Sequence, residues 1–195
     1  MVNRSHGKGR SLWASREGGK KLNAEELRAR QLPIKERYKQ DSAMALFKLK
    51  AAGEIDTQRL TCTVNTPCGK VEAGLHPAAG GDGLAACSGE MLLEALASCA
   101  GVTLSIVATA LGISVRGGTV NVDGDLDFRG TLGVSKETPV GFTAIRIRFE
   151  LDTDADSTQL DNLIRLTERY CVVFQTLKNP PVFEVGRSLA KVTPI

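Results

Sequence analysis

Two cysteines are the residues of this 195-residue chain best placed to do chemistry. Cys99 lies in the apolar run GEMLLEALASCAGVTLSIVATALGI, and Cys171 lies in the amphipathic run TQLDNLIRLTERYCVVFQTLKN. Both runs have the spacing of helices, so each thiol should face an interior or a half-closed pocket. A thiol in that position is either an inert small hydrophobe or a nucleophile sheltered from water. Residue types and spacing alone leave both interpretations open.

The charge of the chain is unevenly distributed. Residues 1–40 carry a net charge of +7 and the remaining residues a net charge of −4, so the basic character belongs to the N-terminal arm. The mildly acidic main part gives no indication of a nucleic-acid partner. The five cysteines are odd in number and lack the spacing of a disulfide framework, and no apolar signal stretch opens the sequence. We therefore expect a reducing, cytoplasmic setting, without a metal or other cofactor.

The N-terminal 42 residues differ in composition from the rest. Residues 1–22 are polar, basic and rich in Gly and Ser, which predicts a disordered tail. Residues 23–42 are expected to form a helical arm, with Asn23 as N-cap and Glu26 three residues later in a capping-box spacing. Pro33 should kink or split this helix. Residues 43–195 are left as the main domain.

The pattern of the main domain predicts an α+β fold with antiparallel sheets. Strands are expected over 43–51, 59–65 and 70–75, with GEIDTQ and TPCG as turns, followed by a glycine-rich loop over 76–89. A long apolar helix comes next, then alternating strands over 119–130 and 141–152. A helix over 157–177 and a last strand over 181–185 complete the order. The buried stripe of that late helix is expected to consist of Leu160, Leu163, Ile164, Thr167, Cys171 and Phe174.

The apolar helix over 91–113 is long enough to cross a membrane, because Glu94 is its only charged residue. Its richness in Ala, Gly, Ser and Thr, and the lack of an aromatic belt around it, favour a central helix enclosed by protein. No membrane association is therefore expected. A chain of this size can hardly enclose such a helix on every side, so a partner subunit is expected to cover part of it.

Four segments together resemble the OsmC/Ohr family of thiol-dependent hydroperoxide reductases. They are GLHPAAGGDG, CSGEMLLEALASCAGVTL, GDLDFRGTLGV and LTERYCVVFQTL, and the likeness covers roughly residues 43–187. The resemblance implies an OsmC-like fold in which sheets surround the long helix, and an intertwined homodimer with two sites at the subunit interface. It also implies that Cys99 is the peroxidatic cysteine and Cys171 the resolving one. The substrate would be an organic hydroperoxide, and an external dithiol of the lipoyl type would restore the reduced enzyme.

The family's peroxidases carry a glutamate ten residues before the peroxidatic cysteine, paired with an arginine. Position 89 of this chain is glycine, and the nearest glutamate is Glu90, nine residues before Cys99. On an ideal helix, ten residues back lies about 80° from Cys99 and nine back about 180°. The family's arginine comes from the first strand–strand turn, which points to Arg59. Glu90 and Arg59 are therefore carried as candidates, each with a solvated surface charge as the alternative.

Two other interpretations are weighed against the peroxidase. A zinc site could be built from Cys62, Cys68, His76 and Cys87, but no C-x-x-C or H-x-x-x-H pair supports it. The second alternative is a non-catalytic protein of the same fold, which binds an apolar ligand in the cleft between subunits and uses its cysteines structurally. The glycine at position 89 favours this alternative, whereas the presence of both cysteines favours the enzyme.

Overall fold

The computed structural model describes residues 22–189, so most of the tail predicted for 1–22 lies outside the described residues. The helices and strands, in order, are α1 Ala24–Gln40, η1 Ser42–Ala45, β1 Gly53–Asp56, β2 Thr61–Thr66, β3 Gly69–Gly74, η2 Pro77–Ala79, β4 Ala86–Cys87, α2 Ser88–Leu111, β5 Val115–Leu126, α3 Phe128–Thr131, β6 Phe142–Thr153, α4 Ser157–Tyr170 and α5 Val172–Lys178. The predicted α+β class is confirmed.

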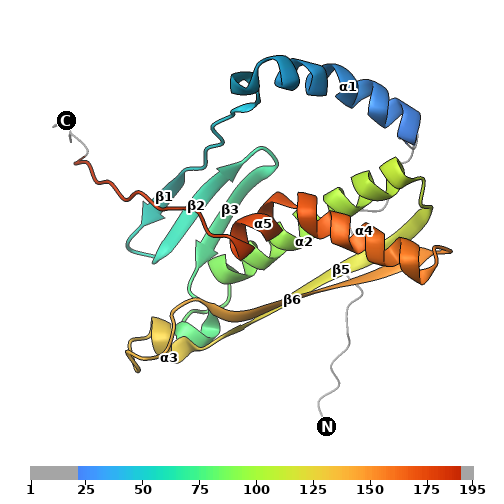
Figure 1. Ribbon diagram of the computed structural model, residues 1–195. Coiled ribbons are helices and arrows are strands. Elements are labelled where there is room, and N and C mark those ends of the chain that lie inside the picture. Colours follow the sequence, from blue (N-terminus) through green and yellow to red (C-terminus); the bar gives the residue numbers. More distant parts are fainter. Residues whose placement is uncertain (1–21, 190–195) are drawn as a thin grey trace, which may run out of the picture.

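The core lies where the helices α2, α4 and α5 pack on the long β5–β6 ribbon (Figure 1). One buried cluster joins α2 to α4 through Leu104, Val107, Ala108 and Leu163, with Phe149 and Leu151 of β6 packed against it. A second cluster joins α2 to the α4–α5 junction through Leu96, Ala100 and Cys171. Burial of these side chains provides the main stabilisation of the fold, at about 25 cal/mol for each Å² of apolar surface removed from water. Both predicted thiol-bearing segments therefore belong to one helical layer.

The β5–β6 ribbon has two different faces. Along β6, partly buried residues alternate with exposed ones from Phe142 to Thr153, as expected for a strand covered on one side. The exposed face carries cross-strand ion pairs between Arg116 and the carboxylates of Asp152 and Asp154, and between Arg146 and those of Asp123 and Asp125. These charged pairs keep the outer face of the ribbon in water while its inner face holds α2.

A smaller sheet of order β1-β2-β3-β4 lies beside the helical layer (Figure 1). The first three strands pair antiparallel, as predicted, whereas the two-residue strand β4 pairs parallel to β3. The strand β4 leads directly into α2, so this sheet is connected to the helix that bears Cys99.

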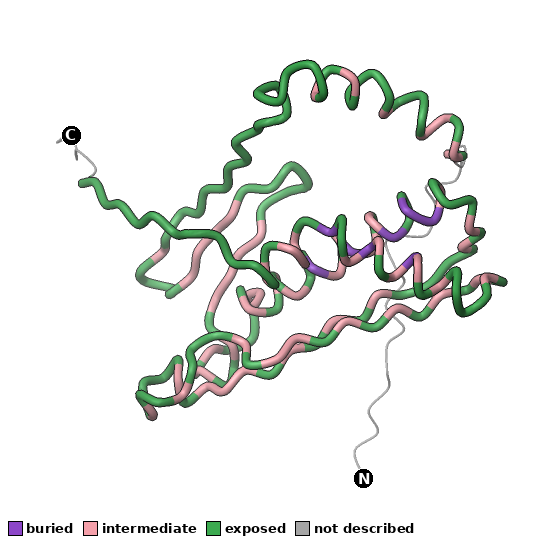
Figure 2. The backbone as a smooth tube through the Cα atoms, viewed as in Figure 1, coloured by how far each residue is buried: buried purple, intermediate pink, exposed green. Residues whose placement is uncertain are grey.

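Helix α2 is only partly covered within one chain. Figure 2 shows buried, partly buried and exposed positions along this helix. Leu96, Ala100, Leu104, Val107 and Ala108 are buried, whereas Leu92, Val102 and Ile106 are exposed. It is also the one described helix that is long and apolar enough to cross a membrane, a test that the core helix of a globular protein passes equally. Its packing against β5, α4 and α5 identifies it as the core helix of this fold.

The arm forms as predicted except at Pro33. Helix α1 begins after Asn23, and the reciprocal capping-box hydrogen bonds between Asn23 and Glu26 are both present. The helix runs through Pro33 without being split. Proline removes one backbone donor, and because none of the helix is buried, water can hydrate the carbonyl group that loses its partner.

Two strand predictions and one turn prediction were wrong for the single chain. The strand expected over 43–51 is instead the short helix η1 followed by extended chain, and β1 occupies the segment expected to be a turn. The strand expected over 181–185 is extended chain without ladder hydrogen bonds, and Val182, Phe183 and Val185 are at least 80% exposed. An alternating sequence becomes a strand only where an edge is available to pair with. Within the described residues of one chain, no edge pairs with either segment.

Candidate active site

The late helix is interrupted at Cys171, which is the feature that builds the site. The sequence predicted one helix over 157–177, but α4 ends at Tyr170 and α5 begins at Val172. Cys171 has extended dihedral angles (φ −73°, ψ 109°) and serves as C-cap of α4 and N-cap of α5. The β-branched pair Val172 and Val173 that follows has low helix propensity, which makes this the natural point for the interruption.

The structure brings Cys99 and Cys171 together. Cys171 is 1% exposed and packs with Leu96 and Ala100 of α2, and Cys99 lies half-buried against the same cluster. Cys171 is close enough to Cys99 to affect its pKa, and neither residue is in a disulfide. Two thiols from segments about 70 residues apart in sequence therefore face one another across the α2–α5 contact.

The two thiols have opposite electrostatic environments. Partial burial raises the pKa of the Cys99 thiol, but hydrogen bonds from the Val173 amide, the Cys171 thiol, the Val172 amide and the Thr103 hydroxyl outweigh it and hold that pKa below its usual value. Burial raises the pKa of Cys171, and its contact with Cys99 adds to the increase against a hydrogen bond from the Phe174 amide. Cys99 is therefore the better thiolate and Cys171 the better proton donor.

Arg59 and Glu90 lie elsewhere in the chain. Both terminal nitrogens of Arg59 pair with the carboxylate of Glu72 on β3, at 2.7 and 2.8 Å. The turn that carries Arg59 is held by Asp56, whose side chain accepts hydrogen bonds from the Gln58 and Arg59 amides, and by Leu60 in the left-handed region (φ 54°). Glu72 was not predicted as the partner of Arg59. Whether Arg59 of a second copy approaches Cys99 stays a prediction.

Glu90 lines a cavity of about 670 Å³ between the first half of α2 and the β5–β6 ribbon. His76, Cys87, Glu94 and Phe142 also line it, whereas Cys99 does not. A Cβ atom at Gly89 would lie at ordinary contact distance, 3.5 Å, from the ring of Phe142 and 3.6 Å from Cys87 Sγ. The family's glutamate position is therefore on the wall of this cavity.

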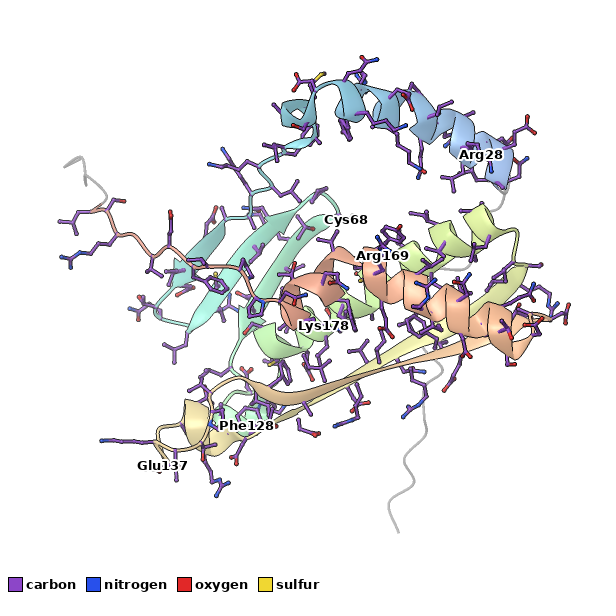
Figure 3. All side chains as sticks on the ribbon, in the orientation of Figure 1. Arg28, Cys68, Phe128, Glu137, Arg169 and Lys178 are labelled. Carbon is purple, nitrogen blue, oxygen red and sulfur yellow. The ribbon has the colours of Figure 1, made fainter. Side chains whose placement is uncertain are left out.

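The remaining candidates do not form a site together. No group of three or more described His, Cys, Asp or Glu residues could hold a metal ion, so the zinc alternative finds no support among residues 22–189. Cys68 is exposed in the β2–β3 turn (Figure 3), and Cys62 is half-buried within β2. His76 caps the short helix η2 by accepting from the Ala78 amide, and its ring stacks on Phe128 at 5.0 Å.

Sequence reasoning missed the backbone part of the site. The amides of Val172 and Val173 and the hydroxyl of Thr103 contact Cys99, and none of them stands out by residue type. The one signal available was the pair of valines directly after Cys171, which could have predicted the end of the helix.

The protein thus has an α+β fold in which two thiols face one another between the long core helix α2 and the interrupted late helix. The sequence profile described as OsmC-like protein matches residues 80–186, more than half of the chain, and the chain belongs to this family. No curated protein sequence matches the chain.

Solved structures agree on the fold. An OsmC-like protein from Mycoplasma pneumoniae superposes with a TM-score of 0.58 at 17% identity, over 69% of this chain and 89% of that one. A hypothetical protein from Aquifex aeolicus gives 0.54 at 18% identity, over 69% and 90%. An organic hydroperoxide resistance protein, OsmC, from Legionella pneumophila gives 0.54 at 16% identity, over 69% and 93%. At these identities the likeness establishes the fold and not the activity.

Proposed function

We propose that this protein is a thiol-dependent peroxidase that reduces organic hydroperoxides with Cys99 as nucleophile and Cys171 as resolving thiol. The observation that carries the proposal is the contact of the two thiols, in which Cys99 has a lowered pKa and Cys171 a raised one. A name among the structural relatives, organic hydroperoxide resistance protein, supports the substrate class.

The reaction follows from this arrangement. The Cys99 thiolate attacks the terminal oxygen of the hydroperoxide, an S–O bond forms, the O–O bond breaks, and the alkoxide leaves as the alcohol after taking a proton. Cys171 then displaces hydroxide from the Cys99 sulfenic acid, which gives a disulfide and water. An external dithiol, of lipoyl type, attacks the disulfide and restores both thiols while it becomes a disulfide itself.

The acting unit is a homodimer. Within the described residues, the side of α2 that the chain leaves uncovered includes Leu92, Val102 and Ile106, which are 38–62% exposed. The exposed apolar side of α2 and the two unpaired extended segments supply suitable surface.

In such a dimer, Arg59 of one subunit is proposed to approach Cys99 of the other. A guanidinium that uses two of its N–H groups on Glu72 has further donors available for a thiolate or sulfenate. Glu90 remains a weaker candidate, because its cavity is separate from the residues that contact Cys99. The proposed setting is the cytoplasm, where dithiol reductants are present.

Peptide mapping after exposure to an organic hydroperoxide tests this function. Stoichiometric consumption of peroxide should be accompanied by a Cys99–Cys171 disulfide, and Cys68→Ser, which removes an exposed thiol away from the pair, should behave as the unaltered protein. If peroxide leaves both thiols unchanged, the protein is not a peroxidase.

The second candidate function is ligand binding without catalysis. The cavity of about 670 Å³ beside Gly89 has apolar walls that include Leu93, Val122 and Phe142, and its size suits a small ligand. Binding of a fluorescent fatty acid that Gly89→Leu abolishes, together with inert thiols, would favour this function over the peroxidase.

A further inference from the structure

The interruption between α4 and α5 changes the hydrogen-bond partners of two backbone amides near Cys99. In an uninterrupted helix, the Val172 amide would donate to the Glu168 carbonyl and the Val173 amide to the Arg169 carbonyl. The regular bonds stop with the Cys171 amide on Thr167 and resume with the Gln175 amide on Cys171. The amides in between are free to donate elsewhere. Cys99 and Val173 pack against the same buried cluster as Cys171, and the amides of Val172 and Val173 lower the pKa of the Cys99 thiol.

The Glu168 carbonyl, which the Val172 amide would occupy in a continuous helix, receives a different donor. The side-chain amide of Gln175 donates to the Glu168 carbonyl at 2.8 Å in a part-buried position. Glu168 is the residue whose carbonyl the Val172 amide would otherwise occupy. A part-buried carbonyl without a donor is unfavourable, so it would draw the Val172 amide back into a continuous helix. Gln175 removes that competition.

Deepening the function proposed above, we propose that Gln175 is a positioning residue that holds the α4–α5 interruption open and so keeps the amides of Val172 and Val173 directed at Cys99. The side chain touches neither thiol's reacting atom in this role; it acts through the Glu168 carbonyl. Gln175 is also held from its other side, because the side chain of Asn179 donates to its Oε1 at 3.3 Å. Its orientation is thus fixed by contacts at both polar atoms.

The lowered pKa of Cys99 provides the readout. Gln175→Leu removes the donor and keeps a similar volume, so Val172 can return to Glu168 and Cys99 loses a hydrogen bond that favours its thiolate. We expect the pH midpoint of Cys99 alkylation by iodoacetamide, followed peptide by peptide in the full chain, to rise by roughly half to one pH unit. At pH 7 the alkylation rate should fall about 3- to 10-fold.

Two further variants make the result decisive. Gln175→Glu is almost identical in shape but lacks the N–H donor at neutral pH, so it should shift the midpoint in the same direction. This variant tests the inference if Gln175→Leu does not fold. Thr176→Leu makes the same kind of change at the next, exposed position of α5 and should leave the midpoint unchanged. Unaltered midpoints in both Gln175 variants would overturn the inference. Because alkylation uses no peroxide, this result is independent of whether the protein turns over hydroperoxides.

Discussion

The α4–α5 junction and the β1–β2 turn are both breaks in regular structure that carry a candidate site residue. They differ in burial and in the partners that their polar groups find within the chain. At the junction, Cys171 is buried and the neighbouring amides, thiols and Gln175 all have partners within the chain. At the turn, the side chain of Arg59 is 63% exposed and pairs with the carboxylate of Glu72. The two thiols are therefore brought together within a single chain, whereas Arg59 lies at the surface, where the proposed dimer would have to bring it to the partner's Cys99.

The largest expected effect concerns the two thiols themselves. Cys99→Ser should abolish hydroperoxide consumption, because the nucleophile is absent. Cys171→Ser should allow one oxidation per chain but leave the sulfenic acid open to further oxidation, visible as sulfinic acid by mass spectrometry. Equal residual turnover in both variants would remove the distinction between nucleophile and resolving thiol.

A second prediction tests the proposed dimer, in which a second subunit covers the exposed side of α2. Val102 is apolar and 62% exposed on the open side of α2, so Val102→Asp should place an unpaired charge in a subunit interface and convert a dimer into monomers. Light scattering at micromolar concentration measures this. Thr66→Asp, on the exposed end of β2, is the matched control. A stable folded monomer of the unaltered protein would contradict the dimer.

Truncation of a buried side chain near the junction should strongly lower the free energy of unfolding. Leu163 on α4 is 0% exposed and packs with Leu104, Val107 and Ala108 of α2. Leu163→Ala should lower the free energy of unfolding by about 2–5 kcal/mol, as measured by urea denaturation. Asp161→Asn, on the exposed side of the same helix, should change it little. A loss below 1 kcal/mol would mean that the junction is not anchored by this cluster.

The pH dependence of thiol reactivity should separate the two cysteines. Because the pKa of Cys99 is lowered and that of Cys171 raised, rising pH should make Cys99 reactive before Cys171 in mass-resolved alkylation. The two pKa shifts change the free energy of unfolding in opposite directions as pH rises. Deprotonation of Cys99 favours the folded state as pH rises above its folded pKa, whereas the stabilisation from protonated Cys171 is lost as pH passes its raised pKa. Reversed order of alkylation would exchange the proposed roles.

The smallest effect is expected at the turn. The Arg59–Glu72 pair is largely exposed, so Glu72→Gln should change the free energy of unfolding by less than about 1 kcal/mol. Its effect on peroxide turnover should be larger than its effect on stability if Arg59 serves the partner's site. A loss of several kcal/mol in urea denaturation would show that the turn is as well supported as the junction.

Sequence reasoning succeeded where the pattern is decided within one element. The capping box at Asn23, the apolar core helix and the strands β5 and β6 were predicted, but the strand expected over 119–130 ends at Leu126 and is followed by α3. It placed Cys99 and Cys171 on the two helices that the structure brings into contact. These features depend on local spacing, which the sequence contains directly.

It failed where the outcome depends on partners distant in sequence. The segments over 43–51 and 181–185 alternate like strands but have no edge to pair with in one chain. The break at Cys171 depends on whether freed amides find new acceptors, and Arg59 depends on Glu72 across the sheet. Such exchanges between alternative partners leave no periodic trace in a sequence.

The uncovered extended segments also bear on how the molecule is made. Leu46, Phe47 and Leu49 are 73–91% exposed, and so are several apolar residues near Val182. If the proposed dimer covers them, a newly synthesised chain would expose these apolar segments until a second copy binds, in competition with aggregation. For a protein assembled in this way, thermal stability rises with protein concentration. Dilution, rather than heat alone, would then be the simplest way to inactivate it.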